Sequence, residues 1–221
     1  MRVGMTRFYQ TSTQPRLTLA KLRESVDILA DRDPDIRRIR DTVGYPPLWA
    51  RRPGFSTLVH IILEQQVSLA SAKAAFDRLV AYTDPLTPES LLPISGARMK
   101  RIGFSRQKTR YARILAEAIL SGELDCKSLN RLDDDAVRDE LMKLTGIGRW
   151  TADIYLIMIL LRPDIWPLGD IALANAMRKV KGLKARPEND RQLEIAEQWR
   201  PHRAVAARCF WHYYLSGELK R

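Results

Sequence analysis

Two glycines and an aspartate in the second half of the chain have the types and spacing that could do chemistry. Gly146 and Gly148 flank Ile147, which suits a tight turn whose backbone N–H groups point outward at the start of a helix. Those amides and the helix dipole present positive potential, so the turn could bind an anion such as a phosphate. Asp170 follows in the sequence Trp-Pro-Leu-Gly-Asp. A lone carboxylate there could stabilise positive charge that develops as a bond breaks.

Each of these features also has a purely structural interpretation. A Gly-x-Gly pair is often only a helix-to-helix turn, and Asp170 suits a helix N-cap. The flanking segments favour the anion-binding hairpin, because 133–143 has helical apolar spacing after an acidic first turn, and 149–161 is apolar nearly all round and stops before Pro163. The sequence therefore predicts two helices joined by a hairpin over 144–148. The N-cap and catalytic roles of Asp170 are compatible.

Three motifs extend this pattern. Leu-Thr-Gly-Ile-Gly-Arg-Trp-Thr-Ala occupies 144–152 ahead of Pro-Leu-Gly-Asp at 167–170, Ile-Leu-Glu-Gln-Gln-Val-Ser occupies 62–68, and Gly-Phe-Ser at 103–105 opens a basic helix. With these motifs the chain resembles the helix-hairpin-helix DNA glycosylase superfamily, and most closely its 3-methyladenine DNA glycosylase II branch. The resemblance spans about residues 50–215, most of the chain.

This resemblance implies a monofunctional DNA glycosylase that flips alkylated purines of the 3-methyladenine type out of duplex DNA and excises them by hydrolysis, initiating base excision repair. Asp170 would be catalytic, stabilising the sugar cation and positioning or deprotonating the attacking water. In bifunctional members a lysine at the position of Trp150 attacks the sugar; an indole cannot, so no AP lyase activity is expected. No cofactor is required, although the hairpin carbonyls could hold a monovalent cation.

The resemblance also assigns a binding surface. Trp150 would present an aromatic face to a cationic alkylated base, which cation–π attraction favours over a normal base. Trp211 matches a second pocket tryptophan, although a core aromatic on a buried helix explains this residue nearly as well. The DNA-binding hairpin would comprise Thr145, Gly146, Ile147, Gly148, Arg149 and Thr151.

Two glutamines stand where relatives place the residue that fills the gap left by the extruded nucleotide. These are Gln65 and Gln66. Some relatives have leucine in place of Gln66, so the wedge in this chain would be polar. Glu64 would either line the pocket or form a surface ion pair, and we expect the surface pair.

The charge balance suits a polyanionic partner. The chain has 37 basic and 26 acidic residues and a net charge of +11. Two basic groups are either solvated faces or phosphate contacts, and we expect phosphate contacts for part of each. The groups are Arg98, Lys100, Arg101, Arg106, Lys108, Arg110 and Arg113, and Arg178, Lys179, Lys181, Lys184 and Arg186. The expected partner is double-stranded DNA containing alkylated bases, bound by a monomer.

The cysteines, the histidines and the apolar runs argue against several classes of protein. Cys126 and Cys209 are too few for a four-cysteine iron–sulfur cluster and indicate free, buried thiols. The histidines lack metal-site spacing, so side chains are not expected to bind a metal. No secretion signal or membrane-spanning run is recognisable, so we expect a cytoplasmic protein, associated with the nucleoid if the source is bacterial.

The elements that must position these residues are all predicted to be helices. No segment shows the strict alternation of apolar and polar residues that a half-buried strand would have. We therefore predict an all-α fold of about nine to eleven helices. The resemblance implies one domain over 1–221 with two helical lobes and an active-site cleft between them. The middle lobe would cover about 55–165 and the second lobe about 18–54 plus 166–221. Residues 1–17 would form an extended lead-in.

Two other functions stay open at this point. A non-catalytic helix-hairpin-helix DNA-binding module would keep both hairpin glycines but would need neither Asp170 nor an aromatic pocket. A glycosylase for another lesion, such as hypoxanthine, an etheno adduct or a mismatch, would share the motifs. Mismatch enzymes, however, often carry the cluster cysteines that this chain lacks.

Overall fold

A computed structural model describes residues 15–218, and this part of the chain contains helices and no strand. The all-α prediction is therefore confirmed, although the twelve α-helices exceed the nine to eleven expected. The helices are α1 (Leu19–Arg32), α2 (Pro34–Val43), α3 (Phe55–Glu64), α4 (Leu69–Thr83), α5 (Pro88–Leu91), α6 (Gly96–Ile102), α7 (Arg106–Leu120), α8 (Asp134–Met142), α9 (Arg149–Met158), α10 (Ile171–Val180), α11 (Asn189–Ala196) and α12 (Arg203–Leu215), with short 3₁₀ helices η1 (Ser128–Arg131) and η2 (Glu197–Trp199).

Short polar side chains fix where many of the helices begin. Thr18, Asp33, Ser68, Ser105 and Asp133 each accept a hydrogen bond from a first-turn amide, at the start of α1, α2, α4, α7 and α8. Each such N-cap stabilises its helix by about 1 kcal/mol. These starts therefore follow from the local sequence.

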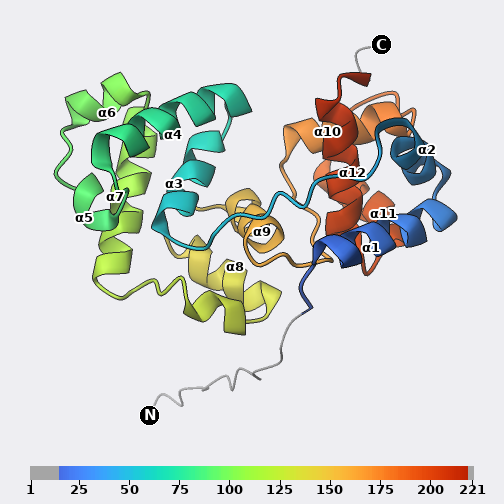
Figure 1. Cartoon of the computed structure of the whole chain (residues 1–221), viewed down its shortest axis with the longest axis horizontal. Coiled ribbons are helices and arrows are strands. Elements are labelled where there is room, and N and C mark those ends of the chain that lie inside the picture. The colour runs from blue at the N-terminus through green and yellow to red at the C-terminus, as the bar shows by residue number, and fades with distance from the viewer. Residues whose placement is uncertain (1–14, 219–221) are drawn as a thin grey trace.

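The helices form two groups that lie side by side along the long axis of the molecule (Figure 1). In one group α3 contacts α4, α7 and α9, and α8 contacts α9. In the other, α12 contacts α1, α2 and α10. The segment 44–54 links the groups and crosses α9, where the Arg51 N–H donates to the Met158 carbonyl at 2.8 Å. Helix α9 thus occupies the middle of the fold.

A buried arginine joins three segments near this centre. Arg208 of α12 is fully buried and donates to the carbonyls of Leu48 at 3.2 Å, Ala204 at 3.1 Å and Ile157 at 2.7 Å. Burial lowers the pKa of Arg208 to about 10, which leaves the guanidinium charged at neutral pH. Its hydrogen bonds tie the link, α9 and α12 together.

Asp33 anchors the group of helices that contains α1 and α12. Its buried carboxylate accepts hydrogen bonds from Lys181 Nζ and Trp199 Nε1, each at 2.7 Å, and from the Asp35 amide at 2.9 Å. Burial raises the pKa of Asp33, but these hydrogen bonds outweigh burial and hold that pKa below its ordinary value. The junction of α1 and α2 is thereby fastened to the end of α10.

The predicted lead-in over 1–17 lies almost wholly outside the described residues. Leu17 is buried, and its N–H donates to the Leu161 carbonyl at 2.8 Å. None of the described helices is long and apolar enough to cross a membrane.

Candidate active site

The hairpin between α8 and α9 forms where the sequence predicts it. Gly146 has a φ of 99°, in the left-handed region that favours glycine. The Tyr111 ring of α7 packs directly against it, so a Cβ atom at this position would lie 2.1 Å from Tyr111 Cγ. Ile147 is buried beneath the turn. Both the backbone and the packing therefore require glycine at 146.

Gly148 is different. Its φ of −99° is open to any residue, and it is the N-cap of α9 without a side-chain cap. A Cβ atom added at this position would have no neighbouring atom within 4 Å. The turn itself therefore requires glycine at 146 but not at 148. The open side of Gly148 instead leaves room for a ligand at the uncapped first turn of α9.

Trp150 and Asp170 meet beside this turn. Asp170 is the N-cap of α10, as predicted, and its Oδ1 accepts a hydrogen bond from the Leu173 amide at 2.8 Å. Its Oδ2 accepts from Trp150 Nε1 at 3.1 Å. Both side chains are half-buried. The structure thus places a fixed carboxylate against an indole at the start of α9.

Two other aspartates, one on α9 and one between α9 and α10, are neutralised by arginines. Asp153 is fully buried between Arg138 at 2.7 Å and Arg149 at 3.0 Å. Asp164 pairs with Arg203 at 2.8 Å. Within residues 15–218, Asp170 has no cationic partner. Of these three aspartates, Asp170 is therefore the one whose charge is free to compensate an external positive charge.

The two adjacent glutamines face different ways. Gln65 Nε2 donates to the Gly146 carbonyl at 2.8 Å and to Thr151 Oγ1 at 3.0 Å, so it ties the end of α3 to the hairpin. The buried Thr151 side chain faces inward. Gln66 is exposed and has a φ of 56°. Of the two predicted wedge residues, Gln66 is the one available to an external partner.

Glu64 does not form the expected surface ion pair. Its side chain is 7% exposed and makes two hydrogen bonds with Arg51, at 2.7 and 2.9 Å. This pair joins the link to the end of α3. No local pattern predicts the pairing, because Arg51 lies in an irregular segment.

The other predicted site residues have mixed positions. Thr145 and Arg149 are exposed, and Arg149 uses its Nε to bind Asp153. Trp211 of α12 is buried in the hydrophobic core, and its role as a wall of the base pocket stays a prediction. Cys209 is a free, buried thiol as expected, whereas Cys126 is free but only half-buried.

Two residues of α7 support the site: Tyr111, which no sequence motif includes, and Lys108, which the sequence analysis groups with possible phosphate contacts. Tyr111 underlies Gly146, and Lys108 Nζ donates to the Leu63 carbonyl at 2.7 Å. Burial lowers the pKa of Lys108. The helical pattern places both on one side of α7, but only the tertiary structure identifies what they contact.

The described residues contain no group of three or more His, Cys, Asp or Glu side chains that could hold a metal ion. In the hairpin, the Leu144 carbonyl accepts from the Ile147 amide at 3.0 Å, and the Gly146 carbonyl accepts from Gln65 at 2.8 Å. Two of the hairpin carbonyls that could bind a monovalent cation thus already accept hydrogen bonds within the protein.

Several known proteins are similar to this chain in sequence. The family model described as HhH-GPD superfamily base excision DNA repair protein matches residues 59–201. DNA-3-methyladenine glycosylase 1 of Schizosaccharomyces pombe is 29% identical over 198 residues, which are 86% of each chain. The putative DNA-3-methyladenine glycosylase YfjP of Bacillus subtilis is 27% identical over 165 residues, which are 71% of this chain and only 58% of that relative.

A solved structure matches over nearly its whole length. The Schizosaccharomyces pombe 3-methyladenine DNA glycosylase Mag1, in complex with abasic DNA, has a TM-score of 0.79 and 27% identity, covering 90% of this chain and 97% of that one.

Proposed function

Because the chain belongs to the HhH-GPD superfamily of base excision DNA repair proteins, we propose that it is a monofunctional DNA glycosylase that removes alkylated purines of the 3-methyladenine type from duplex DNA. The hydrogen bond between Trp150 and Asp170 carries this proposal. It brings an aromatic ring and a carboxylate together at the uncapped start of α9. The names of the similar proteins favour the same substrate class.

Asp170 supplies the charge that base excision needs. Breaking the C1′–N bond leaves positive charge on the sugar, so a fixed anion near C1′ lowers the barrier. Hydrogen bonds from Leu173 and Trp150 hold the two carboxylate oxygens in place. The base departs with the electrons of the broken bond, and a water that forms the new C1′–O bond gives its proton to the carboxylate.

Trp150 accounts for base preference and for the absence of strand cleavage in this proposal. Its ring would attract a cationic alkylated base more than a neutral one. An indole has no amine that could attack C1′ and form a Schiff base. The product is therefore an abasic site in an intact strand.

The hairpin and the end of α3 would hold the DNA. Uncapped amides at the start of α9 suit a phosphate, and the exposed Gln66 suits the gap left by the extruded nucleotide. We also propose that backbone carbonyls of the hairpin would hold a monovalent cation.

The proposal is tested by incubating the protein with methylated DNA and with duplexes that each contain one lesion. Mass spectrometry should identify released 3-methyladenine or 7-methylguanine, and the strand should break only after alkali treatment. Release of hypoxanthine or an etheno adduct alone would assign another lesion. Binding without any released base would favour a non-catalytic DNA-binding module, and a borohydride-trapped adduct would overturn the monofunctional assignment.

A further inference from the structure

A buried ion pair holds the turn that presents Gln66. Arg51 in the link donates two hydrogen bonds to Glu64, the last residue of α3, at 2.7 and 2.9 Å, so both carboxylate oxygens are engaged. Gln66 follows two residues later, with an exposed side chain and a φ of 56°. A backbone conformation that is strained in this way persists only where the surrounding structure enforces it. The proposed mechanism gives the ion pair no task.

Stability alone does not explain this ion pair. The Glu64 side chain is 7% exposed and the Arg51 side chain 27%. The cost of taking two charges out of water often cancels their attraction, so an apolar pair of similar size can stabilise a fold as well. His60, 3.7 Å from Glu64, does not replace Arg51, because burial lowers the pKa of His60 and leaves its ring neutral at pH 7. What the two parallel hydrogen bonds provide is a fixed geometry.

The ion pair lies on a path of hydrogen bonds from the middle of the fold to this turn. The Arg51 amide donates to the carbonyl of Met158, the last residue of α9, at 2.8 Å. The Arg51 side chain binds Glu64, and the next residue, Gln65, donates to the Gly146 carbonyl at 2.8 Å. The residues just before the exposed glutamine are thereby tied both to the hairpin and, through the link, to the end of α9.

We propose that Arg51 and Glu64 are positioning residues, which hold Gln66 where it enters the duplex as the damaged base is extruded. This inference rests on the proposed glycosylase function and on the wedge role of Gln66. Displacing a group by about 1 Å can slow a reaction by about 100-fold. A loosened turn should therefore slow excision from duplex DNA, where a gap must be filled. It should spare single-stranded DNA, where no base pair is opened.

The test compares single-turnover excision rates on duplex and on single-stranded DNA that contain the same alkylated purine. Glu64→Gln keeps the size of the side chain but loses its charge, so excision from the duplex should fall about tenfold while excision from the single strand stays close to the parent rate. Arg51→Gln should have the same effect. The double variant should be no slower than either single variant, because the two residues act as a unit.

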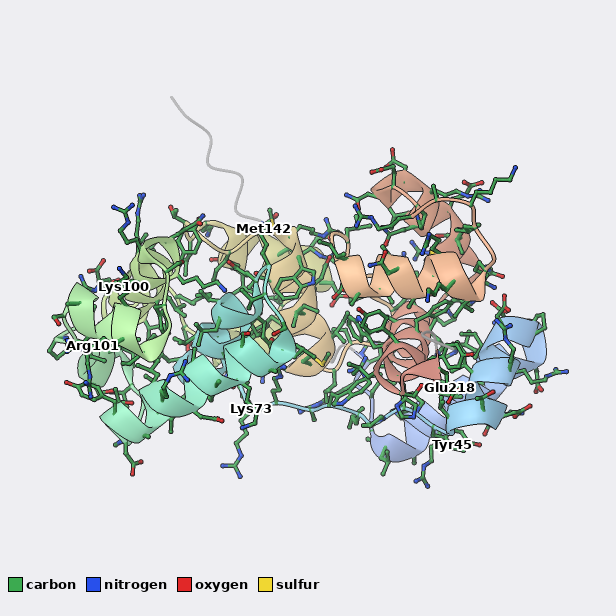
Figure 2. The ribbon with its side chains drawn as sticks, turned by 90° about the horizontal axis from the view of Figure 1, so that it is seen from above. Tyr45, Lys73, Lys100, Arg101, Met142 and Glu218 are labelled. Carbon is green, nitrogen blue, oxygen red and sulfur yellow. The ribbon has the colours of Figure 1, made fainter. Side chains whose placement is uncertain are left out.

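Asp77→Asn is the matched control. Asp77 on α4 also accepts from a cation, Lys73, at 2.6 Å, but its side chain is 55% exposed, and such surface ion pairs contribute little. Lys73 and Met142, which ends α8 just before the hairpin, lie toward opposite edges of the view in Figure 2. The control should keep the parent rates on both substrates. Thermal unfolding verifies that the variants fold, and the double variant, which leaves no unpaired charge, stays informative if a single variant unfolds.

Equal slowing of Glu64→Gln on duplex and single-stranded DNA would overturn the inference, because a structural role alone predicts it, and so would a parent rate on the duplex. A second readout needs no excision: the preference for a duplex with an abasic-site analogue over an undamaged duplex, measured by fluorescence anisotropy. Both single variants should lose part of this preference and Asp77→Asn should keep it. An unchanged preference in the variants, or none in the parent, would contradict the positioning role. Failure of the parent to release any base would contradict the glycosylase function instead.

Discussion

At Asp170, the structural and the proposed catalytic roles use different oxygen atoms. Oδ1 caps α10 through the Leu173 amide, and Oδ2 receives the Trp150 N–H. An N-cap alone explains the residue type but not the second hydrogen bond. The indole therefore has two proposed tasks, which are to orient the carboxylate and to stack against the base.

Two substitutions at Trp150 separate these tasks. Trp150→Phe keeps an aromatic face but loses the N–H, so we expect excision of all bases to slow about tenfold, as the loss of a hydrogen bond to a charged acceptor predicts. Trp150→Ala should in addition slow excision of cationic 7-methylguanine more than of neutral hypoxanthine. Single-turnover rates on both lesions measure this. If Trp150→Ala slows excision of both bases equally, stacking on Trp150 does not favour cationic bases over neutral ones.

Gln66 adopts a conformation that glycine tolerates better. Its φ of 56° costs a residue with a side chain about 1 kcal/mol. Gln66→Gly should therefore leave the free energy of unfolding unchanged or raise it by up to about 1 kcal/mol, while excision from duplex DNA slows because nothing fills the gap. Urea unfolding and excision from single- and double-stranded substrates check both parts. Normal duplex excision by this variant would remove Gln66 from the wedge role.

At the scale of elements, the hairpin makes opposite demands at its two glycines. Gly146→Ser should lower the free energy of unfolding by about 2 kcal/mol or more, because the side chain meets Tyr111 and the φ is positive. Gly148→Ser should leave the free energy of unfolding unchanged or raise it by about a few tenths of a kcal/mol, since serine is a good N-cap in that extended conformation. Urea unfolding of the two variants measures both changes.

DNA binding distinguishes the same two variants further. Gly148→Ser should bind both damaged and undamaged duplexes more weakly despite its stability, because the new side chain occupies the side on which a phosphate would approach. Fluorescence anisotropy with the two duplexes measures the loss. Unchanged affinity would show that DNA does not approach this turn.

The helices are largely predictable because their signals are local. Ser105 and Asp133 each cap a helix that the apolar spacing also predicts, and Asp170 is recognisable as a cap from the residues that follow it. The contacts that build the site are not local. Gln65 meets Gly146, and Trp150 meets Asp170, only after the chain has folded. Sequence motifs therefore point to these residues without indicating which of them hydrogen bond.

At the scale of the whole molecule, the site depends on two groups of helices that meet around α9 (Figure 1). Trp150 belongs to α9, whereas Asp170 begins α10 in the other group. Arg208 ties α9 to the link and to α12. Residues that stabilise either group thus also maintain the distance between Trp150 and Asp170.

Acid should weaken the group anchored by Asp33. Its pKa lies below the ordinary value of 3.8 in the folded chain, so its stabilising contribution is complete above that value and is lost as the pH falls below it. Asp33→Asn should lower the free energy of unfolding by about 3 kcal/mol at pH 7, because Lys181 and Trp199 lose a buried anion.

The difference between the parent protein and Asp33→Asn should shrink as the pH drops below about 4, as urea unfolding at a series of pH values would show. Asp31→Asn is the control, since the Asp31 side chain is 82% exposed and its ion pair with Arg37 is long, at 3.8 Å. A constant difference between parent and Asp33→Asn across this pH range would contradict the account.

The most direct test of the central claim is the single-turnover excision rate of Asp170→Asn on a duplex with one alkylated purine. Asparagine is also a good N-cap, so α10 should still begin at the same place. Excision should fall about 100-fold or more, while binding to a duplex with an abasic-site analogue stays close to that of the parent. Asp139→Asn, at an exposed position of α8, removes the same charge and should keep the parent rate. If Asp170→Asn excises the base within a few-fold of the parent rate, Asp170 is only a helix cap and the proposed mechanism is wrong.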